Sequence, residues 1–346
     1  MVSVTMSIRR ALRFIGLFSL VVLLCWGCGN YRTSDSSVIT LTSSDCRLVD
    51  HDAGETEVCG DPEVVVALSP YILDIMLSLG EEPAGYSAAD LDPAMLGQPK
   101  FDQPSQQIPY VGELMIGTPV NLGDRHNPSL EALAQLNPDL ILGEAWQGEL
   151  GKYELFSHIA PTVLVDDKKG GWQRTLPFLA KALNVEQQIE QINAEYDTRI
   201  EDVRQQLASV VKDHSRVLVI SSGELSGAIF TYNNSEFSRL LEDLGFEVVQ
   251  VAENKLSDDS VISIEALPSV ETDIVMVVGW DDEVSSDIEG LKARQREWEQ
   301  SPLLQRMSAS EAGRVYFIDA RLSTLRGPLA ANAILENYLD QLSSLN

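Results

Sequence analysis

Two stretches of the chain match each other without a gap, 134 residues apart. Residues Ser129–Trp146 and Ser263–Trp280 share the same Ser, Glu, Ala, Leu, Asp and Trp at equivalent positions. A match of this kind indicates that one structural unit occurs twice. It constrains the fold more than any single motif, because both copies must form the same elements in the same order.

Each copy has the pattern of a short helix followed by a buried strand. The leading Ser is a suitable N-cap, a Glu lies in the first turn, and an acidic turn precedes the apolar runs Leu140–Leu142 and Ile274–Val278. Uninterrupted apolar runs are typical of parallel strands buried on both faces. Trp146 and Trp280 follow these strands, at the sheet edge where open α/β sheets bind ligands. The sequence therefore predicts two α/β lobes with a cleft between them.

The longest periodic segment lies between the two copies. Apolar residues recur at helical spacing from Trp172, break near Asn184 and continue to Val210. A continuous helix over residues 186–211 would be about 39 Å long at about 1.5 Å per residue. One rigid helix of that length can connect two lobes, so we expect only modest lobe movement when a ligand binds. The length of 346 residues also fits two lobes.

The first residues indicate export. Arg9, Arg10 and Arg13 precede a run of twelve mostly apolar residues, 14–25, which is shorter than the roughly 20 residues that span a bilayer. The segment Leu24–Cys28 resembles a bacterial lipoprotein processing site, which would make Cys28 a lipidated first residue. Cys25 and Trp26 depart from the usual pattern, which leaves plain secretion and an uncleaved anchor open.

Removal of that signal takes away three arginines and no acid, so the formal net charge changes from −27 to −30. A surface this acidic repels phosphate backbones, which excludes nucleic acid as a partner. Solubility in a salty exterior explains the charge, and attraction of a basic partner protein is the alternative. The segment Gly29–Asp45 is rich in Ser and Thr, as expected for a flexible tether.

Two cysteines of the exported body flank a predicted hairpin. Cys46 and Cys59 enclose two short segments around a turn at Gly54. In an oxidising compartment they could form a disulfide, and two unpaired thiols are the alternative.

An ordered set of segments resembles the substrate-binding proteins of ABC importers for ferric siderophores, haem and cobalamin. The set comprises the signal and tether, Val64–Gly85, Asn127–Glu131 with Pro138–Ile141, the central helix and Gly313–Pro328. The resemblance covers residues 60–346. It implies two Rossmann-like lobes with mainly parallel sheets, joined by one long α-helix and preceded by a small hairpin. The implied ranges are 1–28 for the lipoprotein signal, 29–45 for the tether, 46–60 for the hairpin, 61–170 for the N-terminal lobe, 171–212 for the linker helix and 213–346 for the C-terminal lobe.

The resemblance also implies a function. Such proteins are not enzymes: they bind cargo between the lobes and deliver it to a membrane permease with its ATPase. For this chain it implies an exported monomer in the periplasm or at the cell surface, anchored through lipid on Cys28. The cargo would be a ferric siderophore of the hydroxamate or citrate type, with iron present only as part of the chelate and with no cofactor. Cobalamin or haem binding and a ligand-sensing lipoprotein are the alternatives.

The resemblance assigns roles residue by residue. Glu131 and Glu265 match glutamates that dock onto permease arginines, although acids are favoured in any first helical turn. Arg125 matches an arginine that contacts the chelating oxygens, a task that suits the planar guanidinium, and a surface salt bridge is its alternative. Further candidates for contact with the ligand are Trp146 and Trp280, which could equally be core residues, and Arg321 and Arg326. Weaker candidates are Tyr71 and, in predicted loops, Tyr86, Tyr110 and Tyr232.

Other features leave the chelator open and argue against enzymes. The loop between Glu253 and Ser260 lacks a tryptophan that some hydroxamate binders carry, and Leu322–Thr324 lies where an aromatic residue is common, so citrate-containing siderophores fit two or three arginines better. No glycine-rich nucleotide or phosphate loop and no Gly-x-Ser-x-Gly motif occurs. The four histidines have no metal-ligand spacing, so no catalytic residue or metal site is expected.

Overall fold

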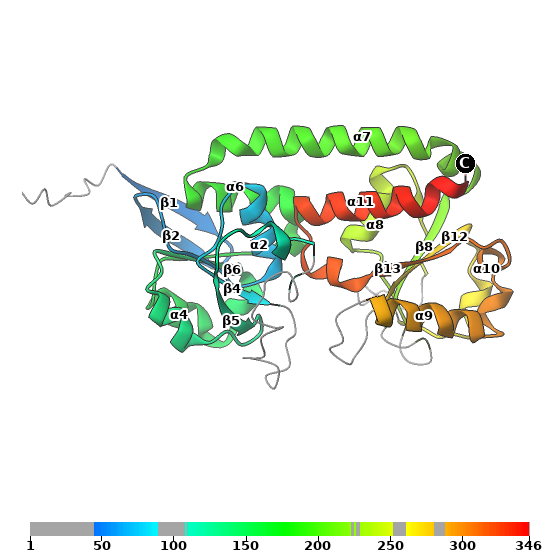
Figure 1. Ribbon diagram of the computed structural model, residues 1–346, viewed down its shortest axis with the longest axis horizontal. Helices are drawn as coiled ribbons and strands as arrows, with labels where there is room; N and C mark the ends of the chain where they lie inside the picture. Colours follow the sequence, from blue (N-terminus) through cyan, green and yellow to red (C-terminus); the bar gives the residue numbers. More distant parts are fainter. Residues whose placement is uncertain are drawn as a thin grey trace, which may run out of the picture. The chain divides into compact units, whose positions relative to one another are not determined.

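The computed structural model describes residues 45–88, 108, 110–222, 225, 229–251, 261–279 and 288–345. The signal, the tether, Cys28 and Trp280 lie outside the described residues. None of the helices in the described part of the chain is both long and apolar enough to span a membrane. The folded body, from Asp45 onward, contains two sheets, each with helices packed against it, and a separate hairpin (Figure 1).

The sheet of the first lobe is wholly parallel. Its strands lie in the order β5-β4-β3-β6-β7, with β3 and β6 side by side in the middle. From β3 the following strands, β4 and β5, are added on one side of the sheet, whereas β7 is added beyond β6 on the other side. The boundary between β3 and β6 is therefore the topological switch point, where open α/β sheets bind ligands. The elements are β3 Val65–Ala67, α2 Pro70–Ser78, β4 Gly85–Ala88, η3 Gly112–Leu114, β5 Val120–Asp124, α4 Leu130–Leu136, β6 Leu140–Glu144, η4 Ala145–Gly151, α5 Lys152–Ser157, β7 Thr162–Val165, η5 Asp167–Lys169 and α6 Gly171–Leu183.

The sheet of the second lobe is mixed. Its main order is β11-β9-β8-β12-β13, and β10 also pairs with β8. Strands β8, β10, β12 and β13 run parallel, whereas β9 is antiparallel to both β8 and β11. The elements are β8 Arg216–Ser222, β9 Ile229–Thr231, α8 Glu236–Asp243, β10 Glu247–Val248, β11 Val261–Ile262, η7 Leu267–Ser269, β12 Ile274–Gly279, α9 Ile288–Gln300, η8 Leu304–Arg306, α10 Ser308–Glu311, β13 Val315–Asp319, η9 Ala320–Thr324, α11 Pro328–Leu342 and η10 Ser343–Leu345.

The internal repeat is visible in hydrogen bonds as well as in strand order. In the first lobe the N–H of Val64 donates to Asp139 Oδ2 (2.8 Å) and the N–H of Asp139 donates back to the Val64 carbonyl (2.9 Å). In the second lobe Arg216 and Asp273 make the same pair of bonds, at 3.0 and 2.9 Å. The repeated aspartate therefore fixes the start of the two central strands, and β6 and β12 are buried at every position.

One part of the repeat differs from the expectation. Residues Leu130–Leu136 form the helix α4, with the Ser129 hydroxyl accepting from the Ala132 N–H. The second copy forms a turn and the short 3₁₀ helix η7, so Glu265 does not lie in the first turn of an α-helix. Pro268 occupies the position of Ala134. Proline has no N–H to donate to the carbonyl four residues earlier, and its ring clashes with that carbonyl, so an α-helix cannot continue through it.

Two helices, rather than one, contact both lobes. The predicted long helix is α7, Ile189–Asp213, preceded by the short η6, Glu186–Gln188. Along α7, six residues at helical spacing are buried, and α7 packs against α11: Ile192, Tyr196, Ile200, Val203, Leu207 and Val210. Helix α11 begins against α2 of the first lobe and passes α8 of the second, as Figure 1 shows. Sequence periodicity predicted α7 and did not predict the second connection.

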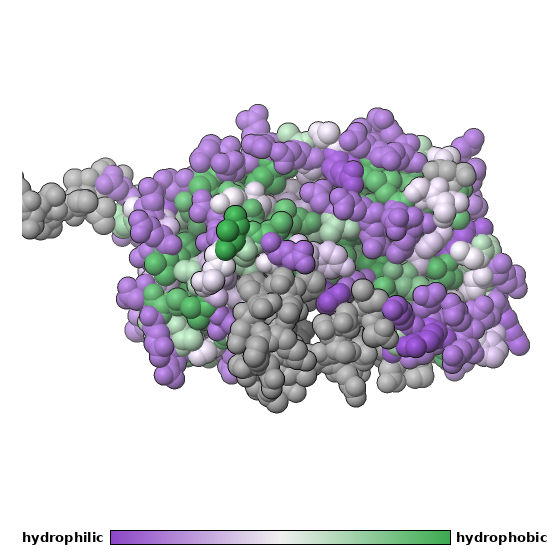
Figure 2. All heavy atoms as spheres, viewed as in Figure 1, coloured by the Kyte–Doolittle hydropathy of each residue, from purple (hydrophilic) through white to green (hydrophobic). Residues whose placement is uncertain are grey.

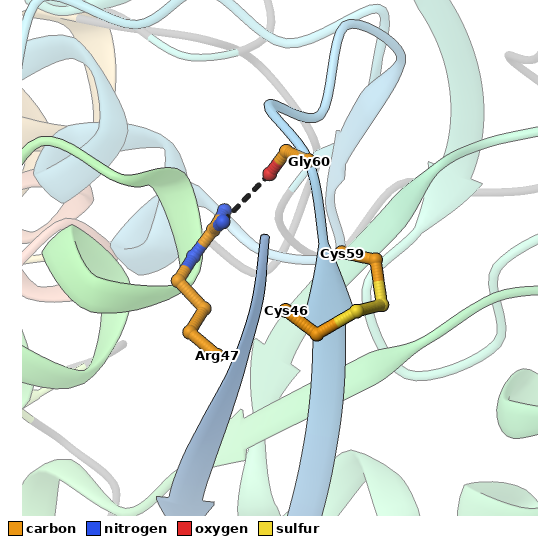
Figure 3. The surroundings of a disulfide bond; sticks show 4 residues. All are labelled: Cys46, Arg47, Cys59 and Gly60. Atoms are coloured by element: carbon orange, nitrogen blue, oxygen red, sulfur yellow. Dashed lines mark hydrogen bonds between the residues drawn. A yellow bond between two sulfur atoms is a disulfide. The ribbon is translucent and has the colours of Figure 1, made fainter. Parts of the chain in front are cut away.

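The N-terminal hairpin is fastened to the first lobe. Strands β1, Cys46–His51, and β2, Gly54–Cys59, pair antiparallel with Cys46 directly opposite Cys59. The two cysteines form a disulfide with an S–S length of 2.04 Å (Figure 3). Beside it, Arg47 Nη1 donates to the Gly60 carbonyl (2.6 Å), and its other guanidinium nitrogens donate to carbonyls of the last turn of α6.

A buried carboxylate adds a second attachment. Asp52, in the hairpin turn, makes a two-pronged ion pair with Arg174 of α6 (2.9 Å for each pair of atoms) and a further ion pair with Lys169 (2.7 Å). Burial alone would raise the pKa of Asp52, but these hydrogen bonds hold it well below its usual range. Asp52 is therefore ionised at neutral pH and contributes to holding the hairpin against α6.

Candidate ligand-binding site

The predicted site residues of the first lobe meet at the carboxyl ends of β5 and β6. Arg125 follows β5, and its N–H donates to the Ala88 carbonyl (2.9 Å) at the end of β4. Trp146 follows β6. The Arg125 Cζ lies 5.8 Å from the centre of the Trp146 ring, within the range of a cation–π contact. Both side chains are half-buried.

A buried glutamine that sequence reasoning missed fixes this arrangement. Gln147 is 2% exposed, and its Nε2 donates to the carbonyls of Leu68 and Arg125, both at 2.8 Å. Its Oε1 accepts from the Glu144 N–H (2.8 Å), and the Glu144 side chain accepts from the Gln147 N–H. These bonds link the ends of β3, β5 and β6. Glu144 and Gln147 thus form a capping box at the start of η4. The sequence signal was weak, because the first residue of a capping box is normally Ser or Thr and here is Glu.

Arg326 reaches from the start of α11 to the end of β6. Its Nη2 donates to Glu144 Oε2 (2.6 Å), its Nη1 donates to the Ser323 carbonyl (3.0 Å), and its Cζ lies 4.9 Å from the centre of the Tyr71 ring. The Glu144 side chain is 1% exposed. The Arg326 backbone has φ +60°, a left-handed conformation that is uncommon for residues other than glycine. A loop held in this conformation needs strong fixation.

Asp74 supplies that fixation. This fully buried carboxylate on α2 accepts hydrogen bonds from the N–H groups of Gly327 (3.0 Å), Leu329 (2.9 Å) and Ala330 (3.0 Å). These donors are the first N–H groups of α11, which no carbonyl of the helix itself can satisfy. Asp74 therefore caps α11 from another lobe. Burial raises its pKa to about 7, although the three N–H donors and Arg326 act in the opposite direction.

A second group of polar contacts joins the lobes at the end of β13. Asp319, the last residue of β13, accepts hydrogen bonds from the guanidinium of Arg321, with 2.8 Å between Arg321 Nε and Asp319 Oδ2. The Tyr110 hydroxyl of the first lobe donates to the same Oδ2 (3.2 Å). Burial and the Asp319 charge raise the pKa of Tyr110 to about 12, so the hydroxyl remains a donor at neutral pH.

The remaining predicted ligand contacts fall in different places. Tyr71 is fully buried, donates to Thr175 Oγ1 (2.9 Å) and supports Arg326. Tyr86 was expected in a loop but lies within β4 and is fully buried in the core, because β4 is an inner strand whose residues are all buried. Tyr232 lies after β9 and packs near Phe237. Trp280 follows β12 in the sequence and is outside the described residues.

The two glutamates of the repeat are exposed. Glu131 lies in the first turn of α4, where its Oε1 accepts from Gln135 Nε2 (3.2 Å). Glu265 lies in the turn before η7. In Figure 2 hydrophilic side chains gather along the upper edge and at the right-hand end of the molecule, with apolar patches between them.

The hairpin carries a group of potential metal-ligating side chains. Among the residues that the structure describes, the one group of three or more such side chains consists of Cys46, Glu57 and Cys59. Both sulfur atoms of this group belong to the disulfide, so they cannot act as thiolate ligands. The group is therefore not a metal centre in the oxidised protein.

Comparisons with known proteins agree with this arrangement. A family model described as periplasmic binding protein matches residues 65–322. The probable siderophore-binding lipoprotein YfiY of Bacillus subtilis is 26% identical over 95% of this chain and 97% of its own length. The Fe(3+)-citrate-binding protein YfmC of the same organism is 26% identical over 89% of this chain and 90% of its own length.

Solved structures show the same fold. Staphylococcus aureus SirA complexed with staphyloferrin B has a TM-score of 0.68 and 24% identity, and the match covers 86% of this chain and 98% of SirA. The petrobactin-binding protein YclQ of Bacillus subtilis also has a TM-score of 0.68, with 21% identity over 86% of this chain and 98% of YclQ. At these identities the structural likeness shows the fold alone.

Proposed function

Because the chain belongs to the periplasmic binding protein family, we propose that it captures a ferric siderophore and serves as the substrate-binding component of an ABC importer. Its relatives are substrate-binding proteins of transporters, so the expectation that it is not an enzyme is confirmed. Relatives that it matches over nearly their whole length carry names that refer to a siderophore and to ferric citrate. These names support the choice of cargo.

The observation that carries the proposal is the position of the arginines. Arg125 follows a strand end of the first lobe, and Arg321 and Arg326 follow β13 of the second. Interlobe contacts through Glu144 and Asp319 bring these segments together. Guanidinium groups suit the anionic oxygens of a hydroxamate or citrate chelate, and Trp146 offers a flat apolar surface beside them. In this proposal iron enters only as part of the chelate, and the protein needs no cofactor.

The proposal includes two further partners. Lipid on Cys28 would hold the exported protein at the membrane, and the segment before Asp45 would act as its tether. Glu131 and Glu265 would contact arginines of the permease, one from each lobe. Their exposure and their equivalent positions in the repeat support this role.

Binding is tested by quenching of tryptophan fluorescence, since the chain contains five tryptophans. The purified protein is titrated with ferric citrate, a ferric trihydroxamate, a ferric tricatecholate, haem and cobalamin, and calorimetry confirms each binding constant. We expect saturable quenching by at least one ferric siderophore. Arg125→Gln should weaken that binding at least tenfold, because it removes a charged donor beside Trp146.

The matched control is Arg306→Gln, which removes an exposed arginine on η8 and should leave affinity unchanged. Binding of haem or cobalamin alone would contradict the proposed cargo and leave the fold intact. Equal effects of the two arginine variants would contradict the proposed site.

A further inference from the structure

Arginines at the strand ends are matched by carboxylates of the protein itself. Arg326 pairs with Glu144 (2.6 Å) and Arg321 pairs with Asp319. At the end of β12, the stem of Arg294 lies over Gly279, and its guanidinium pairs with Glu297 (3.0 Å). A site that contains these arginines is therefore much less positive than their number suggests.

Glu144 differs from the other carboxylates. It is the last residue of β6, next to the residues that position Arg125 and Trp146, and it is 1% exposed. Its Oε2 binds Arg326, whereas its Oε1 is buried and has no hydrogen-bond partner among the described residues. A buried carboxylate oxygen without a donor is costly, and a hydrogen bond to it is favourable. This oxygen is closed to a ligand, so Glu144 acts on the site through its charge and not through a direct contact.

The Arg326 pair alone does not account for this oxygen. A glutamine could accept from the Gln147 N–H and from Arg326 through its one carbonyl oxygen, without placing a negative charge beside the site. The carboxylate charge instead repels anionic groups that approach Arg326. At an effective dielectric constant of about 20 and a distance of about 6 Å, one such charge changes affinity for a monoanion by roughly a hundredfold before screening by salt.

We infer that Glu144 determines the charge class of the cargo: the site selects a ferric chelate of low net charge or one that carries a cationic group, and it disfavours strongly anionic chelates. This inference rests on the proposed function, since it concerns the same site. Arg125 and Trp146 contact the body of the chelate, while the buried charge of Glu144 acts on it electrostatically. The expected cargo is therefore a ferric hydroxamate and not a citrate-type chelate.

The test compares three probes of different charge: a trianionic ferric tricatecholate, a neutral ferric trihydroxamate and a ferric trihydroxamate with a free ammonium group. The wild-type protein should bind at least one hydroxamate probe tenfold or more tightly than the tricatecholate. Glu144→Gln should reduce that preference at least tenfold, because anionic probes gain affinity and the ammonium probe loses it. Salt should weaken the effect of the variant.

Two further variants make the result decisive. Glu190→Gln, on the exposed face of α7, makes the same change in net charge and should leave the preference unchanged. Asp319→Asn removes the carboxylate partner of Arg321 and should shift the preference in the same direction as Glu144→Gln, which keeps the test valid where Glu144→Gln unfolds. Thermal unfolding of each variant identifies loss of structure.

The outcomes separate the two proposals. If a ferric chelate binds but neither variant changes the charge preference, or if the wild-type protein prefers the tricatecholate, the role of Glu144 is contradicted and the proposed function stands. If none of the ferric chelates, including ferric citrate, binds to the wild-type protein, the proposed function itself is contradicted.

Discussion

Asp74 links the stability of the protein to pH. Its carboxylate is fully buried at the start of α11, and burial raises its pKa to about 7, compared with 3.8 for an ordinary aspartate. Because the folded state holds the proton more tightly than the unfolded state, stability is highest below about pH 4 as far as this residue is concerned, and it falls as the pH rises toward 7. The contribution lost over this range is roughly 4 kcal/mol.

We therefore expect Asp74→Asn to remove this component of the pH dependence, because asparagine does not titrate. Urea unfolding at several values between pH 5 and pH 8 measures the free energy of unfolding of both proteins. The difference between wild type and variant should shrink as the pH rises. A difference that stays constant would contradict the assignment.

The pH dependence of the wild-type protein alone does not isolate Asp74, because the titration of His51 changes the stability in the opposite direction. The Asp74→Asn variant contains the same His51, so the difference between the two proteins reports on Asp74. Burial lowers its pKa below the ordinary value of 6.5, so its contribution to stability is lost as the pH falls below that value. Its Nδ1 accepts from the N–H groups of Ala53 (3.2 Å) and Leu164 (3.3 Å), which a protonated ring could not do.

At the same scale, sequence reasoning found some site residues and missed others. Trp146 was predicted because it follows a strand end, and position along a parallel strand indicates which edge of the sheet a residue occupies. Arg125 was predicted from the resemblance to substrate-binding proteins of ABC importers. Glu144 was missed because its partner Arg326 lies 182 residues away. Pairings over such distances depend on the packing of whole lobes, which no local pattern encodes.

Among the elements, the hairpin offers the clearest test of stability. The disulfide between Cys46 and Cys59 closes a loop with a sequence separation of 13. Closing a loop of this size restricts the unfolded chain and stabilises the fold by about 3 kcal/mol. We expect the double variant Cys46→Ser/Cys59→Ser to lose stability of this order, measured by urea unfolding.

A reducing agent serves as the control for that variant. It should lower the stability of the wild-type protein by a similar amount and leave the double variant unchanged. Asp52 and Arg47 still hold the hairpin to α6 after reduction, so we expect the rest of the lobe to remain folded. Loss of all cooperative unfolding in the reduced protein would contradict this view of the hairpin.

The repeat predicted one helix and one strand in each lobe, and one of these predictions is wrong. Matching residues correctly indicated the two central strands and the aspartates that fix them. The helix of the second copy was wrong because one proline, Pro268, outweighs the identical residues before it. The contact of helix α11 with the first lobe was not predicted, since the Asp74 cap is formed by residues distant in sequence.

At the scale of the whole molecule, delivery to the permease can be separated from ligand binding. Glu131 and Glu265 are exposed on different lobes and are not among the residues of the proposed ligand-binding site. We expect the double charge reversal Glu131→Lys/Glu265→Lys to abolish uptake of a radiolabelled ferric siderophore by cells that lack the wild-type protein. The affinity of the purified variant for the same siderophore should not change, since neither glutamate contacts the proposed site.

The matched control reverses two other exposed acids, Glu190 of α7 and Glu311 of α10, and so makes the same change in net charge. It should support normal uptake. Normal uptake by the first variant would reject the docking role, and equal loss in both would point to a general effect of charge. Because α7 and α11 both contact the two lobes, we also expect the lobes to move little when the siderophore binds.

The position of the disulfide has a mechanical consequence. The chain enters the body at Asp45, whose carbonyl accepts from the Gly60 N–H (3.0 Å), and the covalent bridge joins the next residue, Cys46, to Cys59. A force applied to any residue before Asp45 is therefore transmitted through the sulfur atoms directly to Cys59, the last residue of β2. Of the six paired positions of the hairpin, the five beyond the disulfide lie outside this load path, so tension on the N-terminal segment cannot unzip them one after another.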